Sequence, residues 1–138
     1  MKKQRLLKLA DLLEADAANR KGIKFDLGLW GSIDRLDDEV SVSCGTTACA
    51  MGLAVVSGAF KRAGLINGAF TKDIIFPEMK GSGLGGIQAA AELFDIEVGE
   101  ASYLFFDTEY PYEKRRGAAG ERYVAKRIRK FVADGGRV

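Results

Sequence analysis

The chain has 138 residues and a formal net charge of +2; 47% of its residues are hydrophobic and 29% are charged. A chain of this length and composition is typical of one globular domain, so we expect a single helical domain over residues 1–138. No apolar run approaches the roughly 20 residues that cross a bilayer, and charges interrupt the apolar part of any signal peptide, which predicts no membrane association and a cytoplasmic location.

The chain contains no histidine. Histidine-dependent serine or cysteine triads, zinc sites that use histidine and an unperturbed side-chain base near neutral pH are therefore excluded. Two cysteines alone do not supply the four ligands of a structural zinc site. Because the sequence shows no complete catalytic constellation, we name no catalytic residue and expect neither a metal nor a cofactor.

Charge is segregated along the chain: the net charge is +4 over residues 1–24, −8 over 25–109 and +6 over 110–138. Such asymmetry marks either a surface for nucleic acid or an acidic partner, or basic terminal helices that lie against an acidic body. The ends lack the Arg/Gly or aromatic interleaving of nucleic-acid-binding arms, which favours the second interpretation.

The first element in chain order is a helix from Lys3 to Ala18. Its apolar residues recur at three- and four-residue spacing: Leu6, Leu9, Ala10, Leu13 and Ala17. Residues 23–30 alternate as a packed extended segment, with Phe25, Leu27 and Leu29 on one face. The acidic stretch Asp34 to Glu39 lacks the glycine and the distant glutamate of a calcium loop, so we expect a solvated loop.

Both cysteines lie in the segment Cys44-Gly45-Thr46-Thr47-Ala48-Cys49, which is the most specific in the chain. It predicts a tight turn, a hydroxyl cap and then a helix whose first turn holds Cys49, where the helix dipole favours a thiolate. The candidate thiol site therefore comprises Cys44, Cys49, Thr46 and Thr47. The alternative is that both cysteines are small buried apolar residues.

The helix predicted from Thr47 to about Ala63 is rich in small residues, which indicates close backbone packing at the centre of the domain. Gly52 and Gly58 each cost roughly 1 kcal/mol of helix stability relative to alanine, so tertiary contacts must compensate. After this helix, Asn67-Gly68 predicts a tight turn between Leu65-Ile66 and Ala69-Phe70, and residues 74–76 extend the ribbon until Pro77 stops it.

The run Gly81-Ser82-Gly83-Leu84-Gly85-Gly86 fits the G-x-G-x-x-G pattern of dinucleotide-binding turns. In such proteins the turn follows its strand directly, whereas here residues 77–80 separate the glycines from the expected strand. We therefore interpret the run as a loop before a helix from Leu84 to Phe94.

A turn and a second short helix follow, so that the two helices form a hairpin. Five aromatic side chains then lie close together in the sequence, where they either pack in the core, as we favour, or stack on bases: Tyr103, Phe105, Phe106, Tyr110 and Tyr112.

The last helix, from Ala118 to about Ala133, is amphipathic. Its inward residues are expected to be Val124, Ile128, Phe131 and Val132. Its outward basic residues are the candidate partner or nucleic-acid surface: Arg122, Lys126, Arg129 and Lys130.

Several segments are typical of one group of proteins: 6–14, 25–27 with Trp30, 44–52, 89–94, 100–101 with 104–105, Tyr110, and 127–132. In these the chain resembles small uncharacterised bacterial and phage-associated proteins that share a Cys-Gly-Thr-x-x-Cys motif at a helix start. Leu53 departs from the histidine or tryptophan that many of them carry. The resemblance implies a compact helical fold and no established activity.

The sequence as a whole predicts a mainly α fold, a compact helical domain of about five helices with a minor β-hairpin. Our first functional hypothesis is a non-catalytic intracellular binding or accessory module, of phage or mobile-element type, that binds a macromolecular partner or forms a homo-oligomer. The alternatives are a thiol-based redox or sensing protein that uses Cys44 and Cys49, and nucleic-acid binding through the basic C-terminal helix.

Overall fold

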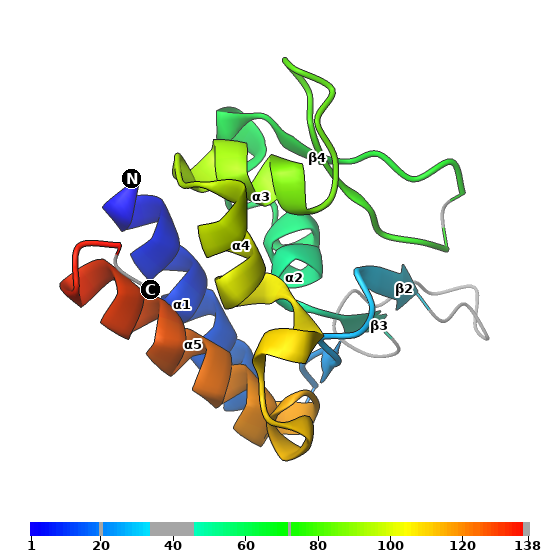
Figure 1. Ribbon diagram of the computed structural model, residues 1–138. Coiled ribbons are helices and arrows are strands. Elements are labelled where there is room, and N and C mark those ends of the chain that lie inside the picture. Colours follow the sequence, from blue (N-terminus) through cyan, green and yellow to red (C-terminus); the bar gives the residue numbers. More distant parts are fainter. Residues whose placement is uncertain (20, 34–45, 72, 137–138) are drawn as a thin grey trace.

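A computed structural model of the protein describes residues 1–19, 21–33, 46–71 and 73–136. Five α-helices form nearly half of this part of the chain (Figure 1): α1 Lys3–Ala17, α2 Ala50–Ser57, α3 Ile87–Phe94, α4 Val98–Phe105 and α5 Gly117–Ala133. Three short 3-10 helices accompany them: η1 Lys61–Ala63, η2 Asp107–Glu109 and η3 Tyr112–Lys114. The prediction of five helices is confirmed, and none of those described is long and apolar enough to cross a membrane.

Helices α1 and α5 lie side by side in Figure 1 and join the two ends of the chain into one layer. The predicted apolar stripe of α1 is buried except for Ala17, which is half-buried. In α5, Val124, Ile128 and Phe131 are buried as predicted, but Val132 is half-exposed. The core therefore runs along the α1–α5 seam and continues beneath the shorter helices.

Ion pairs show how the segregated charge is accommodated. Arg116 of the basic C-terminal segment lies 3.5 Å from Asp26 of the acidic middle, which agrees with the favoured interpretation. Arg129, however, pairs within the two terminal helices: its Nη2 lies 2.5 Å from Asp11 Oδ1 and its Nε 2.7 Å from Glu14 Oε1. Acidic residues of α1 thus form ion pairs with part of the positive charge of α5.

The β content exceeds the single predicted hairpin, so that part of the fold prediction is wrong. One sheet has three strands, β1 Lys24–Phe25, β2 Gly31–Ile33 and β3 Thr46–Ala48, with β3 in the centre, parallel to β1 and antiparallel to β2. The extended segment before β2 packs partly as predicted, since Phe25 and Leu27 are buried while Leu29 is exposed. Asp34 to Glu39 lie outside the described residues.

Helix α2 is shorter than predicted at both ends. Residues 46–48 form β3 because the β-branched threonines suit an extended backbone, and the helix begins only after Cys49. Gly58, with φ of 70°, ends the helix in the left-handed conformation that glycine adopts without strain. The close packing predicted from the small residues is confirmed at Gly52, where a Cβ atom would overlap the Trp30 carbonyl oxygen.

The second sheet pairs β4 Leu65–Asn67 with β5 Pro77–Met79, so the predicted tight turn at Asn67-Gly68 is wrong. Asn67 Oδ1 accepts hydrogen bonds from the amides of Ala69 at 3.1 Å and Phe76 at 2.9 Å, and thereby closes a longer loop. Pro77 is the first residue of β5 and does not stop a strand as predicted. The first position of a strand tolerates proline because no N–H donor is needed there.

β5 ends at Met79, and only Lys80 separates it from Gly81. A strand therefore does stand before the glycine run, contrary to the reason given above against a dinucleotide site. That strand belongs to an antiparallel pair rather than to a parallel βαβ unit, and α3 begins at Ile87 instead of Leu84. The Gly83 amide donates to the Met79 carbonyl at 2.8 Å, which turns the chain back on β5.

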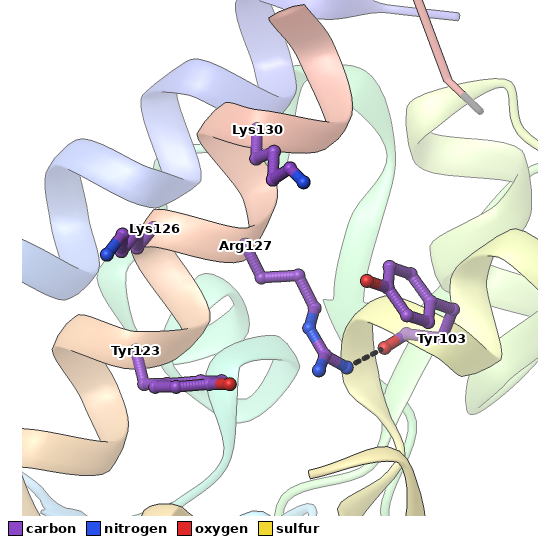
Figure 2. A pocket seen from close by; sticks show the side chains of 5 residues that line it. All are labelled: Tyr103, Tyr123, Lys126, Arg127 and Lys130. Atoms are coloured by element: carbon purple, nitrogen blue, oxygen red, sulfur yellow. Dashed lines mark hydrogen bonds between the residues drawn. The ribbon is translucent and has the colours of Figure 1, made fainter. Parts of the chain in front are cut away.

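Helices α3 and α4 form the predicted hairpin. Asp95 ends α3 in the left-handed conformation, and Glu97 and Glu100 form a capping box at the start of α4. Phe94 and Phe105 stack across the pair with ring centroids 5.7 Å apart. This hairpin presents Tyr103 toward the neighbouring α5 (Figure 2).

Candidate functional site: a basic aromatic pocket between α4 and α5

The predicted thiol site is a buried helix cap. Cys49 is 2% exposed and forms the N-cap of α2, where its Sγ accepts a hydrogen bond from the Gly52 amide at 3.5 Å and donates to the Trp30 carbonyl at 3.7 Å. Burial raises the pKa of the Cys49 thiol from 9.0 to about 11, although backbone hydrogen bonds act in the opposite direction. The expected lowering of its pKa is therefore wrong, because desolvation outweighs the helix N-terminus.

The two threonines of the predicted thiol site lie in β3, before the start of α2. Thr46 is fully buried in β3 and its Oγ1 has no hydrogen-bond partner among the described residues, while Thr47 is half-buried in the same strand. Neither threonine caps α2, contrary to the prediction. Cys44 lies outside the described residues.

We expect native Cys49 to react with iodoacetamide at pH 8 at least about 100-fold more slowly than a free thiol, since both its burial and its pKa disfavour the thiolate. Peptide mass mapping after a short labelling time measures Cys49 separately from Cys44. Denatured protein is the control and should be labelled at the rate of a free thiol. Fast native labelling of Cys49 would contradict the buried-cap interpretation.

The four basic residues predicted as a partner surface divide between two sides of α5. Arg129 is held by Asp11 and Glu14, and Arg122 donates to the Ala17 carbonyl at 3.3 Å, so both face α1. Lys126 and Lys130 are exposed and line a pocket on the side of α4. The predicted surface is therefore not one continuous patch.

The pocket has a volume of about 250 Å³ and is open to solvent (Figure 2). Its lining residues come from two helices: Tyr103 from α4, and Tyr123, Lys126, Arg127 and Lys130 from α5. Residues spaced by three or four along a helix share a face, which is why the four α5 residues meet here. Arg127 extends across the gap toward Tyr103 (Figure 2).

Arg127 is fixed in place by backbone carbonyls and aromatic rings. Its Nη1 donates to the carbonyl of Tyr103 at 3.0 Å and to that of Glu109 at 2.8 Å. The guanidinium carbon lies 3.8 Å from the ring centroid of Tyr110 and 4.3 Å from that of Tyr103, within cation–π range of both. The guanidinium is thus oriented before any ligand arrives.

No carboxylate among the described residues forms an ion pair with Arg127, Lys126 or Lys130. The backbone hydrogen bonds of Arg127 use Nη1, which leaves the Nε–Nη2 edge without a backbone or carboxylate acceptor in the described structure. Burial raises the pKa of Tyr110, and its hydroxyl donates to the Leu104 carbonyl at 2.6 Å, so the ring beneath the guanidinium is neutral. The pocket therefore presents uncompensated positive charge.

The other hollows differ in charge or in lining. A cavity of about 280 Å³ contains Arg115 and Arg116, but Asp26, Asp107 and Glu113 line it as well. A wide, shallow hollow is lined by Arg5, Lys8 and Arg62 without a tyrosine. Of the three hollows compared, the α4–α5 pocket is the one whose lining combines cations with tyrosine rings and contains no carboxylate.

Sequence reasoning missed Arg127 as a site residue and missed a pair of carboxyl groups at the α1–α5 seam. A signal for Arg127 did exist, because the spacing of Tyr123, Arg127 and Lys130 places them on one helical face. In the carboxyl pair, Glu121 is 1% exposed, and burial together with Asp16 raises its pKa from 4.5 to about 9. Nothing in the sequence indicated that this glutamate would be buried.

Comparisons with known proteins do not extend this description: no family model matches the chain, and no curated protein or solved structure is detectably similar to it. The resemblance based on the cysteine segment therefore stays a prediction.

Proposed function

We propose that the protein is a non-catalytic intracellular binding module that holds an anionic group of a macromolecular partner in the pocket between α4 and α5. One observation carries this proposal: Arg127 is held rigidly beside two exposed lysines, and none of the three has a carboxylate partner among the described residues. The expected cytoplasmic location belongs to the same proposal. The buried Cys49 with its raised pKa makes thiol chemistry the weaker alternative.

The geometry of Arg127 suits a phosphate or a carboxylate. A guanidinium offers parallel N–H donors along an edge, and two such donors match the two oxygens of one anion. Hydrogen bonds to charged groups contribute about 1.5–3 kcal/mol each, more than neutral ones. Because Arg127 is already oriented, little further side-chain freedom is lost when the anion binds.

A phosphate titration followed by NMR tests the proposal. We expect inorganic phosphate to shift the Arg127 Nε–H signal and the backbone amides of residues 126–130 in a saturable way. The double variant Lys126→Ala/Lys130→Ala should bind phosphate about three- to tenfold more weakly, since two nearby charges are lost while the contacts of Arg127 remain.

A matched control removes the same charge elsewhere. Lys21 and Lys24 are exposed and lie outside the pocket, so Lys21→Ala/Lys24→Ala should leave the phosphate affinity within about twofold of the original. Equal losses in the two double variants would overturn the proposal, as would phosphate shifts that centre on Arg5, Lys8 and Arg62.

A further inference from the structure

We infer that the partner is single-stranded nucleic acid, with bases stacked on the exposed parts of Tyr103 and Tyr123, on either side of Arg127, and the adjoining phosphates held by Arg127, Lys126 and Lys130. This inference rests on the proposed function and specifies its ligand. The observation behind it is that one open pocket combines half-exposed aromatic rings with a fixed guanidinium and exposed lysines.

The aromatic lining distinguishes a nucleic acid from a simple anion. Tyr103 and Tyr123 come from different helices and face the same cavity (Figure 2), and the guanidinium plane of Arg127 lies between them, 4.3 Å from the first ring centroid and 5.9 Å from the second. Tyrosine rings and guanidinium planes are the surfaces on which unpaired bases stack. A phosphate or carboxylate alone would make no use of the half-exposed tyrosine rings.

The pocket and its rim hold more positive charges than one phosphate group requires. Arg127 lies inside the pocket, whereas Lys126 and Lys130 are exposed at its rim, four residues and therefore about 6 Å apart along α5. Lys114 adds a further positive charge, with its Nζ 6.0 Å from the Tyr123 ring centroid. Several cations around one stacking site favour a strand with successive phosphates over a mononucleotide.

A base inside a duplex is unavailable for this kind of contact, because both of its faces are covered by neighbouring bases. The tyrosine rings lie in a hollow between α4 and α5, so a base must leave its stack to reach them. These features together favour unpaired bases.

Fluorescence anisotropy with a labelled single-stranded oligothymidylate tests the inference. We expect binding that weakens with salt, and about tenfold weaker binding for each of Tyr103→Leu and Tyr123→Leu, because stacking on one ring is lost. Tyr103→Phe and Tyr123→Phe keep the ring face and should bind within about twofold of the original. Lys126→Ala/Lys130→Ala should reduce the slope of log affinity against log salt by about 0.7 per lysine, unlike Lys21→Ala/Lys24→Ala.

Three further probes separate this inference from the proposed function: the matching duplex, the mononucleotide thymidine monophosphate and an oligoglutamate peptide. Weaker binding of all three than of the single strand supports the inference. If the peptide binds more tightly and the leucine variants bind it normally, the inference fails while the anion-binding proposal stands. Equal binding of duplex or mononucleotide also overturns it. If no probe binds and phosphate does not shift Arg127, both fail.

Discussion

Replacing Gly52 with alanine is expected to destabilise the protein by about 3 kcal/mol, even though alanine favours helices more than glycine does. The added Cβ would overlap the Trp30 carbonyl oxygen and approach the Ala48 Cβ to 2.7 Å. That carbonyl also accepts the hydrogen bond from Cys49 Sγ, so a shift of either segment disturbs the helix cap. Urea unfolding measures the change.

Gly99 is the matched control for this substitution. It also lies in a helix, but a Cβ built on it meets no atom within 4 Å. Gly99→Ala should therefore stabilise the protein by about 0.5–1 kcal/mol through helix propensity and reduced freedom of the unfolded chain. If Gly52→Ala is as stable as the original protein, the close approach of α2 to Trp30 is wrong.

Glu121→Gln is expected to stabilise the protein by about 2–3 kcal/mol at pH 7. Glu121 Oε2 and Asp16 Oδ2 are buried and have no hydrogen-bond donor among the described residues. Protonated Glu121 supplies that donor, which is consistent with burial and Asp16 raising its pKa to about 9. A glutamine amide would supply a donor without having to take up a proton.

The sign of the pH dependence follows from this shift. The folded protein binds the Glu121 proton more tightly than the unfolded chain, whose glutamate has a pKa near 4.5. The contribution of this proton to stability is full below about pH 4.5 and is lost as the pH rises toward about 9. Urea unfolding between pH 5 and 9 should show this decline in the original protein, and Glu121→Gln should reduce it.

The exposed Glu113 provides the control, since Glu113→Gln should leave the decline unchanged. A Glu121→Gln variant that is less stable than the original at pH 7 would indicate that Glu121 is ionised and paired. The shared-proton arrangement at the α1–α5 seam would then be wrong.

The long helices were predictable because their signals are local and repeated. The spacing of Leu6, Leu9 and Leu13 defined α1, and that of Val124 and Ile128 defined α5, each to within one residue at its ends. The sheets were not predictable in the same way. β3 has only three residues and pairs with two short strands from residues 24–33, so its register depends on contacts that no local pattern signals.

The candidate site was predictable only in part. Helical spacing placed Lys126 and Lys130 on the surface, but it did not reveal that Arg129 pairs with α1 while Arg127 reaches across to α4. For Cys49, the sequence indicated the helix start correctly but contained no measure of burial. Desolvation, which depends on the packing around Trp30 and α2, decides the pKa of that thiol.

The most direct measurement is the inorganic-phosphate affinity of Arg127→Lys compared with that of Arg122→Lys, both followed by NMR. Both substitutions keep the charge of α5, and Arg122 lies on the same helix outside the pocket. We expect about tenfold weaker binding for Arg127→Lys, because lysine lacks the planar fork, and a change within about twofold for Arg122→Lys. Equal affinities for the two variants would contradict an anion site built around Arg127.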